Sequence, residues 1–101
     1  MDREAEVHQM LKTLFSQSGS RLGARRVVLF GSRAQNRARP RSDFDIAVVG
    51  DTPLPLADFY ALADQLDALP TLYRFDWVDL ARTSEKFRQS ALKQVKVIHE
   101  T

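Results

Sequence analysis

Two short apolar runs, each followed by a glycine, constrain the fold of this chain most strongly. Residues 27–30 (Val-Val-Leu-Phe) precede Gly31, and residues 44–49 (Phe-Asp-Ile-Ala-Val-Val) precede Gly50. Short runs rich in β-branched and aromatic residues are typical of buried strands. The segments around them carry apolar residues at helical spacing, so the chain is expected to alternate helices with strands.

Three longer helices are predicted around these strands. In residues 4–18 the apolar side chains recur at the spacing of one helix face, and Gly19 is expected to end this helix in the left-handed conformation. The same periodicity predicts a helix over residues 56–69 and a last helix over residues 84–94. The residues of the last helix expected to point inward are Phe87, Ala91 and Leu92.

Shorter elements complete the predicted fold. A short helix is expected over residues 32–38, closed by Pro40 because a proline pushes the preceding residue out of the α region. Residues 73–80 predict a third strand, and residues 95–98 predict an edge strand. The fold class is therefore α/β (α+β), with one small mixed sheet of three or four strands covered by helices.

Composition excludes several classes of protein. A chain of 101 residues that is 44% hydrophobic is expected to form a single domain over residues 1–101. It contains no cysteine, which excludes disulfides, thiolate metal sites and thiol nucleophiles. No apolar run approaches the roughly 20 residues that span a bilayer, and the N-terminus lacks the basic and apolar pattern of a secretory signal. These features predict a cytoplasmic protein with no membrane association.

The turn after the first predicted strand is a candidate phosphate-binding site. It reads Gly31-Ser32-Arg33-Ala34. Glycine lets a backbone come close to a ligand, and the free N–H groups at a helix start favour phosphate oxygens. The alternative is a plain strand-to-helix turn in which Ser32 caps the helix.

Two carboxylates stand at the entry to the second predicted strand, in the sequence Asp43-Phe44-Asp45. Residues two apart point to the same face of a strand, so both carboxylates share one environment. At about 4 Å and an effective dielectric constant near 20, two such charges repel by roughly 4 kcal/mol. A divalent cation between the two carboxylates makes the arrangement favourable, and oxygen ligands suit Mg²⁺ or Mn²⁺. Alternatively, one Asp caps a turn and the other pairs with Arg39 or Arg41.

A third acidic residue, Asp76, falls inside the third predicted strand. Alternation places it on one face with Val78 and Leu80, and places Asp79 on the other face. If Asp76 lies beside the Asp43-Asp45 pair on an adjacent strand, the three carboxylates form a cluster that accepts one or two metal ions. Asp79, near the strand end, is expected to be a turn or cap residue. His8 and His99 are expected to be surface or packing residues.

The charge is unevenly distributed, because no acidic residue lies between Glu6 and Asp43. The basic residues of this stretch are Lys12, Arg21, Arg25, Arg26, Arg33, Arg37, Arg39 and Arg41. Either something anionic docks there or the arginines are neutralised across the fold by later acidic residues. The net charge is only +2, and the aromatic residues are not interleaved with these arginines as a stacking platform requires. Nucleic-acid binding is therefore disfavoured.

Together these features resemble the minimal nucleotidyltransferases, called MNT domains, of the DNA polymerase β superfamily. The resemblance rests on Gly31-Ser32-Arg33-Ala34, on residues 42–48 and on residues 75–80, and it covers nearly the whole chain. A Gly-Ser turn followed by Asp-x-Asp on one strand and by a later Asp on another is a specific pattern. The resemblance implies the polymerase β-like nucleotidyltransferase fold.

The resemblance also implies roles for the candidate residues. Gly31 and Ser32 would hold the β and γ phosphates of a nucleoside triphosphate, within a nucleotide-binding turn that includes Arg33. Asp43 and Asp45 would bind Mg²⁺, or Mn²⁺ in its place, and Asp76 would complete the catalytic and metal site beside the attacking hydroxyl. The implied reaction is in-line attack of that hydroxyl on the α-phosphate of ATP or another triphosphate, with release of pyrophosphate.

The implied partner is a protein. About 100 residues build the catalytic sheet and its helices, so the acceptor is expected to be held by another molecule. Stand-alone MNT proteins are commonly encoded with a helical HEPN-type toxin, and some act as antitoxins by adding AMP to a tyrosine of that toxin. The resemblance thus implies a protein adenylyltransferase (AMPylation) in a toxin–antitoxin hetero-oligomer. The alternative is a non-catalytic antitoxin that neutralises its partner by contact alone.

The chain departs from the family pattern directly after Ala34. MNT proteins usually continue with Arg-Gly, whereas this chain has Gln35-Asn36. Asparagine tolerates the left-handed conformation that glycine would take at a helix end, so the turn is expected to survive. The missing arginine leaves Arg37, Arg39 and Arg41 as candidates to supply its charge.

Overall fold

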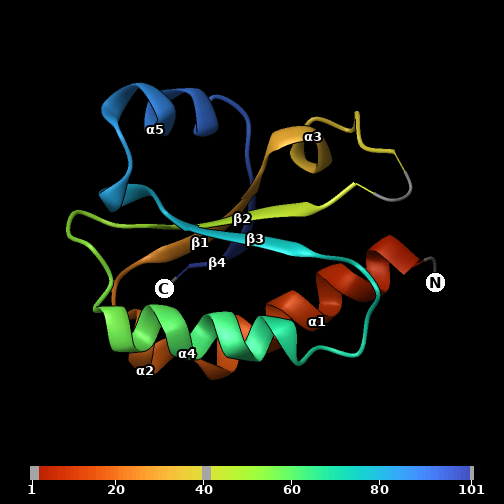
Figure 1. Cartoon of the computed structure of the whole chain (residues 1–101), viewed down its shortest axis with the longest axis horizontal. Helices are drawn as coiled ribbons and strands as arrows, with labels where there is room; N and C mark the ends of the chain where they lie inside the picture. Colours follow the sequence, from red (N-terminus) through yellow and green to blue (C-terminus); the bar gives the residue numbers. More distant parts are fainter. Residues whose placement is uncertain (1–2, 40–41, 101) are drawn as a thin grey trace.

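The sheet has four strands in the order β3-β2-β1-β4 (Figure 1). β1 (Arg26–Phe30) pairs antiparallel with β2 (Phe44–Val49) and, on its other side, with β4 (Lys96–His99). β2 pairs in parallel with β3 (Phe75–Asp79), which forms one edge of the sheet. The predicted small mixed sheet covered by helices is therefore confirmed.

This arrangement comes from a computed structural model that describes residues 3–39 and 42–100. Within these residues, no helix has the length and apolar character needed to cross a lipid bilayer. Pro40 and Arg41 lie outside the described residues, and so do the predictions that involve them.

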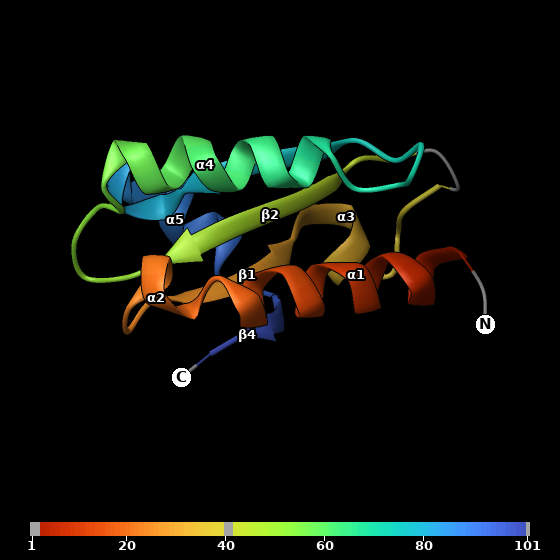
Figure 2. The ribbon, with the colours of Figure 1, turned by 90° about the horizontal axis from the view of Figure 1, so that it is seen from below.

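Helices lie on both faces of the sheet (Figures 1 and 2). One face carries the two long helices, α1 (Arg3–Gln17) and α4 (Leu56–Asp67), together with the short α2 (Gly19–Leu22). The other face carries the short helices α3 (Gly31–Ala34) and α5 (Glu85–Ala91). Each predicted helix is present, but α3 and α5 are shorter than the sequence pattern suggested.

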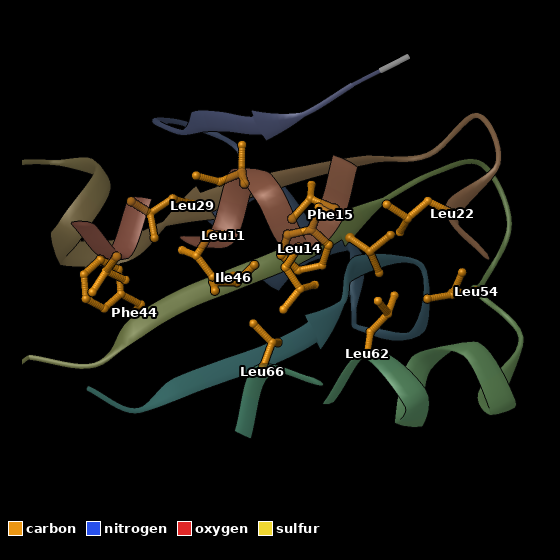
Figure 3. Close-up of a cluster of buried hydrophobic side chains, with 14 residues drawn as sticks. Leu11, Leu14, Phe15, Leu22, Leu29, Phe44, Ile46, Leu54, Leu62 and Leu66 are labelled. Atoms are coloured by element: carbon orange, nitrogen blue, oxygen red, sulfur yellow. The ribbon is translucent and has the colours of Figure 1, made fainter. Parts of the chain in front are cut away.

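The main hydrophobic core lies between the sheet and the long helices. Leu11, Leu14 and Phe15 of α1 and Leu62 and Leu66 of α4 point into it (Figure 3). The strands contribute alternate residues, such as Phe44, Ile46 and Val48 of β2. Because successive strand residues point to opposite faces, the residues between them, Asp45 and Ala47, lie on the face of α3 and α5.

The second face has a smaller core. Its buried members are Val28, Phe30, Ala47 and Leu80. Helix α5 has no buried residue, although Ala91 and Leu92 pack against this cluster as predicted. Phe87 was also predicted to point inward; its ring meets that of Phe30 in a T-shaped contact with 6.1 Å between centroids, but Phe87 remains 43% exposed and so is not a core residue.

The end of the first helix also differs from the prediction. α1 ends at Gln17, and the buried Ser18 hydroxyl donates a hydrogen bond of 2.8 Å to the Leu14 carbonyl of its last turn. The chain continues into α2, which starts at Gly19, and the left-handed residue is Gly23, with φ of 62°. The side chain of Ser18 takes up a carbonyl that the helix end leaves free, so Gly19 need not terminate the helix.

Candidate active site

Asp45 lies at the centre of a row of residues that crosses three strands. Its register partner on β1 is Phe30, and its partner on β3 is Asp76. Directly paired residues share a face, so the Asp45 and Asp76 side chains stand side by side on the face of α3 and α5. The two carboxyl groups lie close enough for Asp76 to raise the pKa of Asp45. The predicted adjacency of Asp76 to the Asp43-Asp45 segment is confirmed.

The carboxylate pair concentrates negative charge. Burial, contact with the Asp76 side chain and the charges of Asp76 and Asp43 together raise the pKa of Asp45 from 3.8 to about 6. Asp45 is half-buried, whereas Asp76 is exposed on the edge strand. A half-buried carboxylate beside two others favours a positive group, and oxygen ligands of this kind suit a hard divalent cation.

Gly31 brings the turn after β1 into contact with this pair. Its φ is 71°, a conformation that glycine adopts readily and other residues rarely do. A Cβ atom at this position would overlap the Asp45 carboxylate and lie 3.2 Å from its Cγ. Both the backbone and the available space therefore require glycine here. Ser32 follows in α3 without capping the helix, since no side-chain cap is present at its start.

Asp43 lies just before β2 and is exposed. Its charge reaches Asp45, but its position also borders a groove of about 1130 Å³ between the start of α1 and residues 69–74. Across residues 3–39 and 42–100, no three acidic or histidine side chains are grouped closely enough to hold a metal ion. Within the described residues, the structure thus has an Asp45–Asp76 pair with Asp43 nearby, rather than the compact cluster of three carboxylates that was expected.

The structure places Arg33 away from the carboxylate pair. Its side chain is only 4% exposed and stacks over Phe44, which belongs to the core of the opposite face. Its Nη2 atom donates a hydrogen bond of 2.7 Å to the Ser42 carbonyl. The guanidinium of Arg33 is therefore occupied within the fold, and the nucleotide-binding role expected of Arg33 stays a prediction. Its neighbours come from distant parts of the sequence, so no local pattern reveals this position.

Several other arginines of the acid-free stretch are also used within the fold. Arg21 forms an ion pair of 2.8 Å with Asp58. Arg25 donates hydrogen bonds to the Thr52 and Pro53 carbonyls. The alternative in which later acidic residues neutralise these arginines is confirmed for Arg21, whereas Arg25 hydrogen-bonds backbone carbonyls instead.

The remaining polar predictions fall outside the pair. Asp79 is buried and caps the short 3-10 helix η1 (Leu80–Arg82), accepting hydrogen bonds from the Ala81 and Leu54 amides at 3.0 and 2.7 Å. It therefore acts as a cap residue, as predicted. His8 packs edge-on to Phe44 with its pKa lowered by burial, which agrees with the packing role expected of it.

The turn that departs from the family pattern keeps its shape. Asn36 has φ of 57°, the left-handed conformation that was expected of it. Its side-chain oxygen accepts a hydrogen bond of 3.0 Å from Lys96 on β4. Arg37 contacts the Gln35 side chain and Arg39 is exposed, so neither is buried within the fold as Arg33 is.

Two residues of the site have contacts that the sequence did not reveal. Phe30 looked like an ordinary strand residue, and its place in the row follows only from the register of β1 with β2. Ser42 belongs to residues 42–48, which carry the family resemblance, but only the structure shows its hydrogen bond with Arg33. Strand register is the signal that would have found Phe30, but a single sequence does not fix it.

Comparisons with known proteins place the chain in a family. The sequence profile described as "Polymerase beta, Nucleotidyltransferase" matches residues 10–101. The protein named "Probable protein adenylyltransferase MntA" of Haemophilus influenzae is 31% identical over 100 residues, covering 99% of this chain and 85% of that protein.

Solved structures agree with this. A minimal nucleotidyltransferase aligns with a TM-score of 0.64 and 29% identity over 95% of both chains. A toxin–antitoxin crystal structure with AMP-PNP aligns with a TM-score of 0.65 and 28% identity, covering 89% of this chain and 73% of the other. An MNT antitoxin in complex with tri-AMPylated Shewanella oneidensis HEPN toxin gives a TM-score of 0.62 and 25% identity, covering 93% of this chain and 73% of the other. With its Gly-Ser turn against a carboxylate pair, this chain belongs to the polymerase β family of nucleotidyltransferases.

Proposed function

We propose that this chain is a Mg²⁺-dependent protein adenylyltransferase that transfers AMP from ATP to a hydroxyl of a partner protein. The partner is a HEPN-type toxin, and the chain acts as its antitoxin within a hetero-oligomer. The observation that carries this proposal is the contact between the Gly31 turn and the Asp45–Asp76 pair. This contact places a backbone turn that can bind phosphate next to carboxylates that can bind a cation.

Related proteins support the choice of substrate and acceptor. The Haemophilus influenzae relative bears the name of a protein adenylyltransferase. One similar structure is a toxin–antitoxin with AMP-PNP, an ATP analogue, and another pairs an MNT antitoxin with an AMPylated HEPN toxin. An adenine nucleotide as donor and a HEPN toxin as acceptor are therefore the most economical assignment for this chain.

We assign a magnesium ion to the carboxylates from their chemistry, although their side chains are not grouped as a ligand set within the described residues. Asp45 and Asp76 are register partners on neighbouring strands, and the charges of Asp76 and Asp43 both act on Asp45. These three residues would hold Mg²⁺, with Mn²⁺ as a substitute, because hard oxygen donors are the ligands both ions prefer. When bound, the ion neutralises negative charge on the triphosphate and its leaving group.

The residues of the chain orient the two reactants. Gly31 has no side chain, so the Gly31-Ser32 backbone can approach the β and γ phosphates beside Asp45. Asp76 is exposed on an edge strand, which leaves this side open to an acceptor hydroxyl. The hydroxyl gives up its proton to water, its oxygen bonds to the α-phosphorus, the bond from that phosphorus to the bridging oxygen breaks, and pyrophosphate leaves.

Intact mass spectrometry of the partner tests the proposal. The HEPN-type protein encoded beside this chain is incubated with the chain, ATP and Mg²⁺, and the Asp43→Asn, Asp45→Asn double variant serves as the control. A gain of whole AMP units that requires the two aspartates is expected. A tight complex without any gain in mass would instead identify an antitoxin that acts by contact alone.

A further inference from the structure

Ser42, the residue before Asp43, forms hydrogen bonds through three of its own atoms. Its amide donates a hydrogen bond of 3.0 Å to the Arg39 carbonyl, and its hydroxyl accepts one of 3.0 Å from the Arg39 amide. Its carbonyl accepts the bond of 2.7 Å from Arg33 Nη2. The position of Ser42 is therefore fixed from both the loop and the helix α3.

Arg33 is itself firmly placed. The centre of its guanidinium lies 4.3 Å from the Phe44 ring centroid and 5.1 Å from that of Tyr73. Its Nη1 atom lies 3.7 Å from Glu4 Oε2 on α1. A planar guanidinium can lie over aromatic rings and donate hydrogen bonds from its edge at the same time, which a lysine ammonium cannot do.

This contact links two parts of the active site. Arg33 follows directly on the Gly31-Ser32 turn, and Ser42 is bonded to Asp43. On the other side of Asp43, the Phe44 amide donates a hydrogen bond of 2.9 Å to the Arg74 carbonyl. The exposed Asp43 thus lies between Ser42 and Phe44, whose backbones both form hydrogen bonds. Arg33 donates one of these hydrogen bonds, to the Ser42 carbonyl.

We propose that Arg33 is a positioning residue that acts from the opposite face of the sheet. By fixing Ser42, it sets the distance of Asp43 from the Gly31 turn and from Asp45. This inference rests on the proposed function, in which Asp43 binds Mg²⁺ together with a nucleotide. Its consequence is that loss of Arg33 weakens the binding of Mg²⁺ rather than the binding of phosphate.

Calorimetry of Mg²⁺ binding in the presence of AMP-PNP tests this role. Arg33→Met keeps an apolar stem but loses the hydrogen bond to Ser42, and it is expected to weaken Mg²⁺ binding by about ten-fold. Arg33→Lys should recover part of that loss. Amide hydrogen exchange should accelerate at residues 42–44, while the KM for ATP at saturating Mg²⁺ stays near that of the unmodified chain.

Because Arg33 is buried, its variants can fail to fold, so a second pair of variants is needed. Tyr73→Leu removes one of the rings beside the guanidinium, whereas Tyr73→Phe keeps it and serves as the matched control. Tyr73→Leu is expected to weaken Mg²⁺ binding by about three-fold, with no change in Tyr73→Phe. Equal Mg²⁺ affinities in the two folded Tyr73 variants would overturn the proposal. A raised KM for ATP in a folded Arg33 variant that binds Mg²⁺ normally would make Arg33 a phosphate ligand instead.

The Asp45→Asn variant separates this inference from the proposed function. If Asp45→Asn binds Mg²⁺ with AMP-PNP as tightly as the unmodified chain, the proposed metal site itself is wrong. If Asp45→Asn loses binding while the Arg33 and Tyr73 variants keep it, the metal site stands and only the positioning role fails.

Discussion

The two faces of the sheet use the same strands for different purposes. On the face of α1 and α4, a continuous cluster of large buried side chains fills the space between sheet and helices (Figure 3). On the face of α3 and α5, the buried cluster is small and a carboxylate pair stands beside it. Strand alternation permits this division, because neighbouring residues point in opposite directions. One face supplies most of the stability, and the other is free to carry charge.

Asp45 and Ile46 show the contrast most directly, since they are adjacent in β2. Ile46 is fully buried in the main core, whereas Asp45 is half-buried against Gly31 and Asp76. Substitutions at these two positions should therefore separate activity from stability. The following predictions test that division, beginning with the largest effect.

Asp45→Asn should lower the rate of AMP transfer by about 1000-fold, because a metal ligand contributes several kcal/mol to the reaction. The free energy of unfolding should stay the same or rise, since the amide brings no charge to a half-buried position beside another carboxylate. Transfer assays and urea unfolding measure the two quantities. Transfer at the unmodified rate would remove Asp45 from the site.

Ile46→Ala should give the reverse result. Removing a fully buried side chain from the main core should lower the free energy of unfolding by about 2 to 5 kcal/mol. The fraction that remains folded should still transfer AMP. Leu72→Ala is the control in urea unfolding, because Leu72 is completely exposed and its loss should change little. An equal effect of both substitutions would contradict the packing described for the main core.

Gly31→Ala should damage both properties. The positive φ alone should reduce the free energy of unfolding by about 1 to 3 kcal/mol, and the new Cβ would displace the Asp45 carboxylate. Gly19→Ala is a matched control, because open space surrounds Gly19 and it starts a helix. Thermal unfolding and nucleotide binding of the two variants give the comparison. If Gly31→Ala behaves like Gly19→Ala, the close approach of the turn to Asp45 is wrong.

Phe87→Ala should have the smallest effect. Phe87 is partly exposed on α5, so its removal should lower the free energy of unfolding by less than about 1 kcal/mol. Thermal unfolding measures this, and a loss as large as that of Ile46→Ala would show that α5 stabilises its face as strongly as α1 stabilises the other.

Much of the fold follows from local patterns in the sequence. Residues 44–49 were predicted as a strand and form β2 with those bounds. The period of two also assigned Asp76 and Asp79 to opposite faces, which agrees with the clusters in which their neighbours lie. These predictions succeed because strand alternation depends on backbone geometry alone.

The features that the sequence did not reveal concern residues whose conformation depends on tertiary partners. Arg33 is placed by the rings of Phe44 and Tyr73, which lie far from it in the sequence. Phe87 is exposed because α5 packs only lightly on the sheet, which helical periodicity does not reveal. The grouping of Asp45 with Asp76 could be stated only as a condition, because one sequence does not determine which strands are neighbours.

The parallel pairing of β2 with β3 has a consequence for the order of folding. β1 and β2 are joined by residues 31–43, a shorter connection than residues 50–74, so Phe30 is expected to meet Asp45 before β3 docks. Parallel strands need a crossover, and here residues 50–74 must form α4 and return along the sheet before β3 can dock. Such non-local contacts form slowly. Asp76 is therefore expected to join Asp45 late in folding, and a nascent chain that ends before β3 is without the carboxylate pair.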